Sequence, residues 1–214
     1  MKKNLLYVLF ALSLGLVASC SRTQPSPSAT PSGDEQHAHH HHQAVEAGPP
    51  SQDSIYNLDA SWQDQNGHQR RLVEDRGQVV VLAMIYSSCK GACPRIVADM
   101  QAIEQTVASA HPGKVAFRLV SFDPQVDSPE RLRQYAQEAK LGSDWALLCG
   151  PEDQVLELAA LLGVKYRRTG PSDFAHSNLI TVLDHQGEIV YQQEGLGVDP
   201  AAMLAAIEQL LAGH

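Results

Sequence analysis

The sequence predicts a mixed α/β domain, and three patterns support this fold class. Residues 79–85 and 115–121 are largely apolar without alternation, which is typical of strands buried on both faces of a sheet. After the first run, apolar residues recur every three to four positions, as in an amphipathic helix. Residues 65–68 and 184–187 are turn-forming sequences between short strand-like segments, so each predicts a β-hairpin.

The other expected elements follow in chain order. A helix is expected to begin within residues 127–130, with Ser128 as its N-terminal cap. A short strand ends at Cys149, another helix follows it, and a last amphipathic helix comes after the second hairpin. This alternation predicts a mixed sheet flanked by helices on both faces. With the hairpin at residues 65–68 as an N-terminal extension, the order fits a thioredoxin-like fold.

Two cysteines, Cys89 and Cys93, lie in the turn that leads from the first buried strand into its helix. Pro94 suits the first helical position, because the missing N–H of proline has no partner to lose there. Cys93 then lies at or next to the helix cap, where unpaired N–H groups and the charge of Lys90 favour a thiolate. Such a pair suits thiol–disulfide exchange or the binding of a soft metal ion.

A structural disulfide between Cys89 and Cys93 is the simpler alternative. Closing so short a loop stabilises a fold by only about 2 kcal/mol on the chain-entropy formula, and a longer loop would gain more. The position of the pair, between a buried strand and a helix that begins near a proline, therefore favours a functional site.

Residues 1–20 have the features of a bacterial export signal. Lys2 and Lys3 precede an apolar core that is too short to span a membrane. Residues 16–20 resemble a lipobox, which implies cleavage before Cys20 and acylation of Cys20 as a membrane anchor. An ordinary secretory signal with a chance cysteine remains the alternative. Export places the mature protein where disulfides persist, which is the periplasmic side if the cell is Gram-negative.

Residues 21–50 have the composition of a disordered linker, rich in Pro, Ser and Ala without an apolar period. The linker contains a histidine tract: His37, His39, His40, His41 and His42. Neutral imidazoles bind copper, zinc and nickel, so the tract is a candidate accessory metal site. A solvated tract without function, or the remnant of an expression tag, is the alternative.

Residues 51–214 are expected to form one domain, long enough to bury a core. The formal net charge of −8 and the lack of a basic face argue against a nucleic-acid partner. Cys149 lies in an apolar segment, so an inert core thiol is the expected role, with a partner role for the cysteine pair as the alternative.

His176 is the candidate for a third metal ligand. Two thiolates hold Cu(I), and an added imidazole lets a site accept Cu(II) as well. The histidine lies in a polar segment, expected to be a loop, that leads into the strand at residue 179. Loops at strand ends often carry sites in α/β folds, although a loop histidine is more often simply solvated.

The chain resembles the SCO/SenC family, the copper-handling proteins of cytochrome c oxidase assembly. The resemblance covers roughly residues 55–212 and rests on three motifs: Cys89-x-x-x-Cys93-Pro94, the segment SFDPQVDSPE at residues 121–130, and His176-Ser177 before a strand. It implies a thioredoxin-like fold and copper bound through two cysteines and a histidine. Carried over to this chain, these ligands are Cys89, Cys93 and His176.

Two positions depart from the family pattern. The family often has Asp directly after the first cysteine, where Lys90 stands, and directly before the histidine, where Ala175 stands. Lost carboxylates weaken the shell that orients metal ligands, and a cation beside the site disfavours bound copper. Both changes move the expected balance toward thiol–disulfide chemistry.

The resemblance implies a membrane-anchored copper chaperone, carrying Cu(I) or Cu(II) to the CuA subunit of cytochrome c oxidase or to another exported cuproprotein. Because the cysteines must be reduced to bind copper, a Cys89–Cys93 disulfide and metal loading exclude each other. A thiol–disulfide reductase, with both cysteines catalytic, is the second hypothesis. A metal buffer based on the histidine tract is the third. A peroxidase is disfavoured, because no peroxidatic motif is recognisable.

Overall fold

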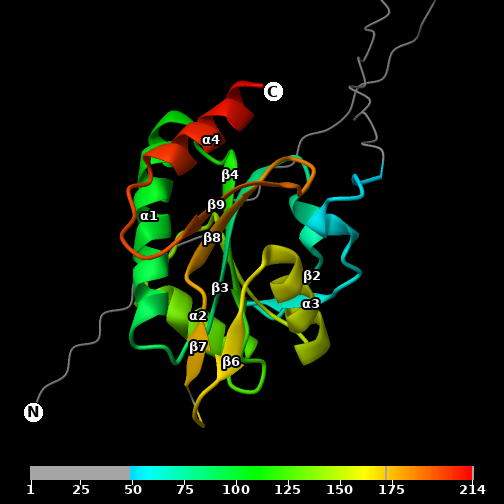
Figure 1. Ribbon diagram of the computed structural model, residues 1–214, viewed down its shortest axis with the longest axis vertical. Coiled ribbons are helices and arrows are strands. Elements are labelled where there is room, and N and C mark those ends of the chain that lie inside the picture. The colour runs from blue at the N-terminus through cyan, green and yellow to red at the C-terminus, as the bar shows by residue number, and fades with distance from the viewer. Residues whose placement is uncertain (1–48, 172, 214) are drawn as a thin grey trace, which may run out of the picture. The chain divides into compact units, whose positions relative to one another are not determined.

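A seven-stranded mixed sheet forms the centre of the domain in this computed structural model, which describes residues 49–171 and 173–213 (Figure 1). Along the sheet the strand order is β2-β1-β5-β4-β3-β8-β9. The bounds of these strands are β1 Trp62–Asp64, β2 Gln69–Arg70, β3 Val79–Ile85, β4 Val115–Ser121, β5 Trp145–Cys149, β8 Leu179–Leu183 and β9 Ile189–Glu194.

The centre of the sheet is parallel and its edges are antiparallel. Strands β3, β4 and β5 pair in parallel, with Val79 opposite Val115 and Phe117 opposite Trp145. On one side β8 joins β3 antiparallel, and on the other β1 joins β5 antiparallel. All residues of β3, β4 and β5 are buried, which confirms the prediction of strands covered on both faces.

Four α-helices cover the two faces: α1 Ala92–Ala110, α2 Pro129–Glu138, α3 Glu152–Leu162 and α4 Ala201–Ala212. In Figure 1, α1 and α4 lie together on one side of the sheet and α3 lies on the other. The helix α2 shares the side of α1, because both belong to right-handed crossovers that run in the same direction. Gln101 of α1 accordingly donates a hydrogen bond of 3.0 Å to the Ala139 carbonyl at the end of α2.

The N-terminal part of the domain adds the predicted hairpin and two short 3-10 helices. The hairpin consists of β1 and β2 around residues 65–68, as expected from the sequence. The 3-10 helices are η1 Ile55–Asn57 and η2 Leu72–Asp75. The fold is therefore thioredoxin-like with a hairpin extension, and the extension belongs to the main sheet because β1 pairs with β5.

A two-stranded ribbon, β6 Tyr166–Arg168 and β7 Phe174–His176, lies outside the main sheet and was not expected from the sequence. Each strand has only three residues, which is too short to show an alternating pattern. The ribbon packs through aromatic rings: Phe122, which follows β4, stacks on Tyr166 at 4.9 Å between ring centroids and contacts Phe174 at 5.2 Å. His176 therefore ends a strand, where a loop was predicted.

Helix starts confirm one sequence prediction and correct another. The Ser128 side chain accepts a hydrogen bond from the Arg131 N–H, so Ser128 caps α2 as predicted. Pro94 was expected at the first position of α1 but is its third residue, since the helix begins at Ala92 with Gly91 as cap. Proline is tolerated there because the first N–H groups of a helix have no intrahelical partner.

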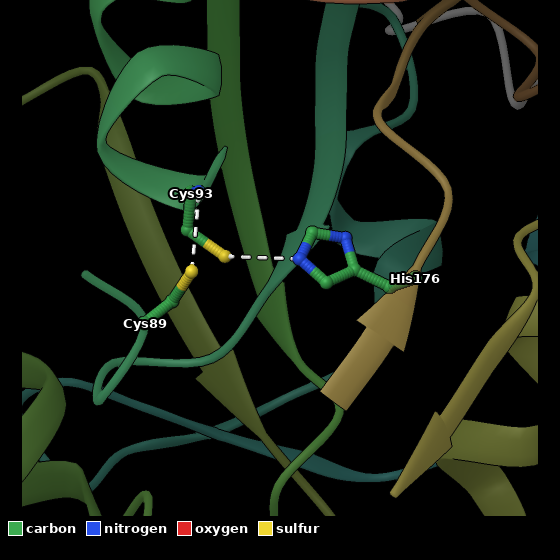
Figure 2. A group of neighbouring side chains, drawn as sticks. All are labelled: Cys89, Cys93 and His176. Atoms are coloured by element: carbon green, nitrogen blue, oxygen red, sulfur yellow. Dashed lines mark hydrogen bonds between the residues drawn. The ribbon is translucent and has the colours of Figure 1, made fainter. Parts of the chain in front are cut away.

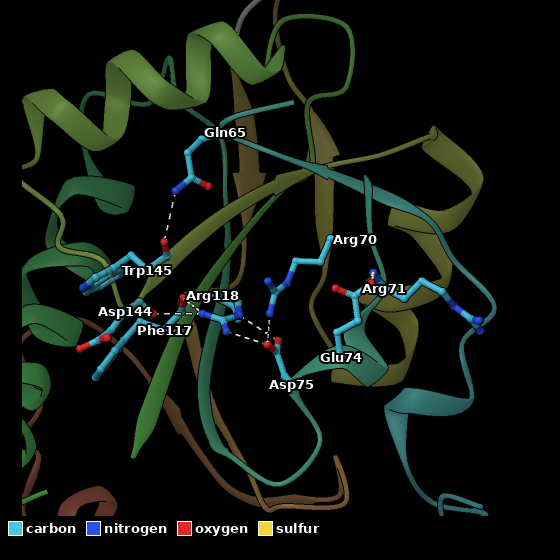
Figure 3. A network of polar contacts seen from close by, with 9 residues as sticks. All are labelled: Gln65, Arg70, Arg71, Glu74, Asp75, Phe117, Arg118, Asp144 and Trp145. Carbon is cyan, nitrogen blue, oxygen red and sulfur yellow. Dashed lines mark hydrogen bonds and ion pairs between the residues drawn. The ribbon is translucent and has the colours of Figure 1, made fainter. Parts of the chain in front are cut away.

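A buried ion-pair network closes the end of the sheet opposite the cysteines (Figure 3). Asp75 of η2 receives hydrogen bonds from both Arg118 of β4 and Arg70 of β2. Arg118 also donates to the carbonyls of Phe117 and Asp144, so its guanidinium is extensively paired although the residue is only 5% exposed. The network ties the hairpin extension to the central strands.

Several predictions concern residues that lie outside the described part of the chain. These are the export signal at residues 1–20 with the lipidation site Cys20, all but the last two residues of the linker at residues 21–50, and the histidine tract at residues 37–42. Among the described residues, none of the helices has both the length and the apolar character that a membrane crossing requires.

Candidate metal centre

The two cysteines occupy the turn between β3 and α1. Cys89 is tied back to the end of the strand, since its N–H donates to the Tyr86 carbonyl at 3.2 Å. Cys93 is the second residue of α1, and its N–H donates to the Sγ atom of Cys89 at 3.4 Å (Figure 2). The first turn of the helix thus directs an unpaired backbone donor at one of the two sulfurs.

His176 reaches the cysteines from the end of the ribbon strand β7. Its Nε2 atom lies 3.8 Å from the Sγ atom of Cys93 (Figure 2). Its other nitrogen, Nδ1, lies 2.9 Å from the oxygen of the Ser177 carbonyl. Because a carbonyl oxygen can accept a hydrogen bond but cannot donate one, Nδ1 carries the proton of the neutral ring and Nε2 keeps its lone pair. The Sγ atoms of Cys89 and Cys93 and a ring nitrogen of His176 all lie within 4.8 Å of one another.

Aromatic side chains fix the orientation of the imidazole. The ring of Phe122 lies 5.2 Å and that of Tyr86 lies 5.8 Å from the His176 ring, between centroids. Arg168 holds the ribbon from a second direction, with a 2.8 Å ion pair to the buried Asp123 and its guanidinium 4.4 Å from the Phe174 ring. His176 is only partly buried, so the site is open to an incoming ligand on the imidazole side.

The two thiols differ in acidity, and the sequence prediction for Cys93 is wrong. Burial raises the pKa of Cys89, but hydrogen bonds from the backbone of Cys93 and Gly91 and from the Tyr86 side chain more than offset this, and its pKa falls to about 7. Burial raises the pKa of Cys93 far above its usual range, and charge on Cys89 adds to the effect. The thiolate-favouring environment is therefore at Cys89, because the donor of the helix start points at Cys89 and Cys93 is fully buried.

The buried carboxylate of Asp127 supports the cysteine turn. Asp127, 2% exposed, accepts hydrogen bonds from the Ser87 N–H at 2.9 Å, from the Ser87 hydroxyl, and from the Ser121 hydroxyl at 2.5 Å. Arg131 donates to the Ser87 hydroxyl at 3.0 Å. No local sequence signal could reveal this role, since an aspartate directly before the helix cap Ser128 is typical of any helix start.

Three further positions from the sequence analysis, Lys90, Ala175 and Cys149, do not belong to the three-residue cluster. Lys90 is exposed and has no hydrogen bond or ion pair within residues 49–171 and 173–213. Ala175 faces Arg167 across the ribbon. Cys149 is buried in β5 as predicted, its Sγ atom lies 3.7 Å from the Gln63 carbonyl, and burial raises its pKa to about 11.

The profile of the SCO1/SenC family matches residues 50–212. This chain belongs to the SCO1/SenC family. Membership agrees with the Cys-x-x-x-Cys turn and the remote histidine that the fold brings together. A curated relative, the SCO1 protein homolog of Bacillus subtilis (strain 168), is 24% identical over 146 residues, which cover 65% of this chain and 74% of that protein.

Solved structures of other family members share the fold. A SCO1/SenC family lipoprotein from Bacillus anthracis matches with a TM-score of 0.65 and 21% identity over 71% of this chain and 92% of that chain. Arabidopsis thaliana ScoI with copper bound has a TM-score of 0.64 and 16% identity, over 72% and 97%. BsSco, from the Sco family of cytochrome c oxidase assembly proteins, has a TM-score of 0.64 and 19% identity, over 72% and 93%.

Proposed function

We propose that this SCO1/SenC protein binds one copper ion through Cys89, Cys93 and His176 and passes it to another exported protein. The observation that supports this most directly is the convergence of two sulfurs and one imidazole nitrogen within 4.8 Å from segments more than eighty residues apart. Arabidopsis ScoI, which has the same fold, has been solved with copper bound.

The chemistry of the donor set fits copper. Two thiolates are soft ligands that suit Cu(I), and an imidazole nitrogen adds the ligand that Cu(II) prefers. The proton on Nδ1 of His176 leaves Nε2 as the donor atom, and Nε2 is the nitrogen nearest Cys93. Copper is here a cargo, so the site must bind it firmly enough to carry it and release it on contact with an acceptor.

The receiving protein and the anchor extend this proposal. BsSco belongs to a family of cytochrome c oxidase assembly proteins, which supports the CuA subunit of an oxidase, or another exported cuproprotein, as the acceptor. The lipobox-like end of the signal at Cys20 and the lipoprotein relative from Bacillus anthracis support a lipid anchor on a bacterial membrane. In this arrangement, residues 21–50 form a tether and the histidine tract at residues 37–42 collects metal near the membrane.

Copper titration of the reduced protein tests the site. The wild-type domain is expected to bind one equivalent tightly, and Cys89→Ser or Cys93→Ser to abolish tight binding. His176→Ala is expected to weaken Cu(II) more than Cu(I), because two thiolates satisfy Cu(I) without a nitrogen. Cys149→Ser and His68→Ala are the matched controls, since both residues lie outside the cluster. Undiminished affinity in both cysteine variants would disprove the proposal.

A thiol–disulfide reductase is a second candidate, favoured by the contrast between the two thiols. Cys89 accepts a hydrogen bond from the Cys93 N–H and is the less buried of the pair, which suits an attacking thiolate. Cys89 would attack a target disulfide, release one target thiolate and form a mixed disulfide. Cys93 would then attack the Cys89 sulfur, release the second target thiolate, and leave a Cys89–Cys93 disulfide, so that two electrons pass to the target.

Variants separate the two functions. A copper carrier needs His176, whereas this exchange reaction uses only the two cysteines. His176→Ala is therefore expected to lower Cu(II) affinity and leave the rate of reduction of a small aromatic disulfide within about twofold of wild type. If wild type fails to reduce that disulfide while it binds copper tightly, the reductase hypothesis is wrong.

A further inference from the structure

Several exposed cations without a partner lie on or next to the elements that form the cysteine–histidine site. In the part of the chain that the structure describes, seven exposed Lys or Arg side chains have no hydrogen bond, ion pair or ring contact: Lys90, Arg95, Lys114, Arg133, Lys140, Lys165 and Arg167. Four of these lie on or next to the elements that form the site. Lys90 lies between the two cysteines, and Arg95 is in the first turn of α1. Lys165 directly precedes β6, the strand that pairs with β7, and Arg167 belongs to β6.

The geometry of the ribbon places two of these cations close to the imidazole. Tyr166 of β6 is directly opposite His176, and Arg167 is opposite Ala175. The Lys165 backbone N–H donates to the Ser177 hydroxyl at 2.9 Å, so Lys165 is adjacent to the end of β7. A depression of about 400 Å³ is lined by Lys165, Tyr166, Arg167, Ala175, His176 and Ser177. We call Lys90, Arg95, Lys165 and Arg167 the cationic rim.

Among the described residues, no acidic side chain forms an ion pair with a cation of the rim, although Glu152 lines a pocket with Arg167 and Asp99 lies one turn after Arg95 on α1. Asp123 and Asp127 are buried, and they are already bound by Arg168 and by the Ser87 and Ser121 hydroxyls. Asp173 is the one exposed carboxylate among the described residues of the ribbon segment 165–177, which also carries three cations. The whole chain has a formal net charge of −8, so a positive region around the site runs against the overall composition.

We propose that the cationic rim is the docking surface for an acidic protein partner that exchanges metal with this site. The inference rests on the proposed copper function and names the charge of its partner. Unpaired surface cations lose no internal ion pair when a carboxylate-rich surface approaches them. A positive rim also repels free copper ions, so it favours transfer within a docked complex. Opposite charges raise association rates, and the effect extends over about 10 Å at moderate salt.

The test uses two synthetic peptides as probes, each with the sequence Cys-Gly-Gly-Cys and loaded with Cu(I). One is flanked by glutamates and the other by lysines. Copper transfer to the protein is followed by stopped-flow absorption of the copper–thiolate bands. The double variant Lys165→Glu with Arg167→Glu is expected to slow transfer from the glutamate-flanked peptide about tenfold at low salt, and to lose most of this difference at high salt.

A matched double variant controls for net charge. Lys114→Glu with Lys140→Glu makes the same charge change at two cations that also have no partner, but Lys114 precedes β4 and Lys140 precedes β5, at the opposite end of the sheet from the cysteines. This control is expected to change the rate less than twofold. Equal slowing by the two double variants would overturn the proposal, because net charge alone would then explain the effect.

A metal-free measurement keeps this inference separate from the proposed function. A fluorescent glutamate-flanked peptide with serines in place of the cysteines is expected to bind wild type more tightly than the rim variant, in fluorescence anisotropy. If copper titration succeeds but this difference is absent, docking is wrong and the copper site stands. If the peptide binds as expected but copper does not bind, the rim stands and the copper function fails. The rim variant is also compared with wild type for binding to phosphatidylglycerol vesicles. If the variant loses this binding but accepts copper from the peptide at the wild-type rate, the rim binds a membrane surface and the proposal is wrong.

Discussion

Two buried aspartates at opposite ends of the sheet have contrasting partners. Asp75, 1% exposed, lies between the guanidinium groups of Arg70 and Arg118, so its charge is compensated by direct ion pairs (Figure 3). Asp127, 2% exposed, accepts hydrogen bonds from two serine hydroxyls and one backbone N–H, and it has no direct ion pair among the described residues. The same residue type is thus buried in two different electrostatic settings.

The contrast shows which buried charge reaches the site. A carboxylate surrounded by cations exerts little field beyond its network, and the Asp75 network consists of the hairpin extension and the central strands. The charge of Asp127 is less compensated, and it contributes to the raised pKa of Cys93, after burial and the effect of Cys89. Asp127 also holds Ser87, two residues before Cys89. We therefore expect Asp75 to govern stability alone and Asp127 to govern both stability and the thiols.

The largest expected effect is the loss of stability on removing the carboxylate of Asp75, whose charge is compensated by two arginines. Asp75→Ala leaves the Arg118 guanidinium buried without its counter-charge, and such a loss costs about 3–5 kcal/mol. Urea unfolding measures the free energy of unfolding. Copper stoichiometry of the folded variant is expected to equal that of wild type, since Asp75 and the cysteines lie at opposite ends of the sheet.

The matched control is Asp59→Ala, which breaks the solvent-exposed Arg71–Asp59 pair of 3.1 Å and is expected to change stability very little. A loss of copper binding in Asp75→Ala, under conditions where the variant is folded, would contradict the proposed separation between the two ends of the molecule.

Asp127→Asn is expected to have a smaller effect on stability and a clear effect on the thiols. The amide replaces one acceptor oxygen by a donor, so at least one of the donors of Ser87 or Ser121 loses its partner, at a cost of about 1–3 kcal/mol. Loss of the negative charge removes one cause of the raised pKa of Cys93, so its pKa falls. Alkylation of Cys93 at alkaline pH, followed by mass spectrometry, is expected to be faster than in wild type, whereas Asp75→Ala leaves that rate unchanged.

The pH dependence of alkylation distinguishes the three buried thiols of wild type. The pKa of Cys89 is lowered to about 7, so its thiolate fraction rises as pH increases through 7 and is lost as pH falls below it. Cys93 and Cys149 have raised pKa values and are expected to react only at higher pH. Iodoacetamide labelling between pH 5 and 9, mapped by peptide, measures this order. Preferential labelling of Cys93 at pH 7 would contradict the assignment of the thiolate to Cys89.

The smallest expected effect concerns Tyr86. Its side chain hydrogen-bonds Cys89, and this bond is the weakest of the main causes that lower the Cys89 pKa. Tyr86→Phe is expected to raise the midpoint of Cys89 alkylation by well under one pH unit, because the backbone donors of Cys93 and Gly91 remain. An unchanged fold in circular dichroism together with an unchanged midpoint would show that the hydrogen bonds from Cys93 and Gly91 set the acidity of Cys89 without Tyr86.

Local sequence patterns were sufficient for most of the fold. The strands β3 and β4, the amphipathic pattern of α1 and the cap at Ser128 were predicted, because burial periodicity and capping depend on residues close together in the chain. The cysteine turn was predicted for the same reason. A thioredoxin-like arrangement then follows from strand order and the right-handed rule for crossovers.

The completed site depended on contacts between distant parts of the chain. His176 meets Cys93 across a separation of 83 residues, through a ribbon that packs on Phe122 and is pinned by Arg168 to Asp123. The acidity of each thiol depended on burial and on the direction of one N–H group, which placed the thiolate on Cys89 and not on Cys93. Desolvation and long-range hydrogen bonds set these properties, and neither is encoded in the spacing of neighbouring residues.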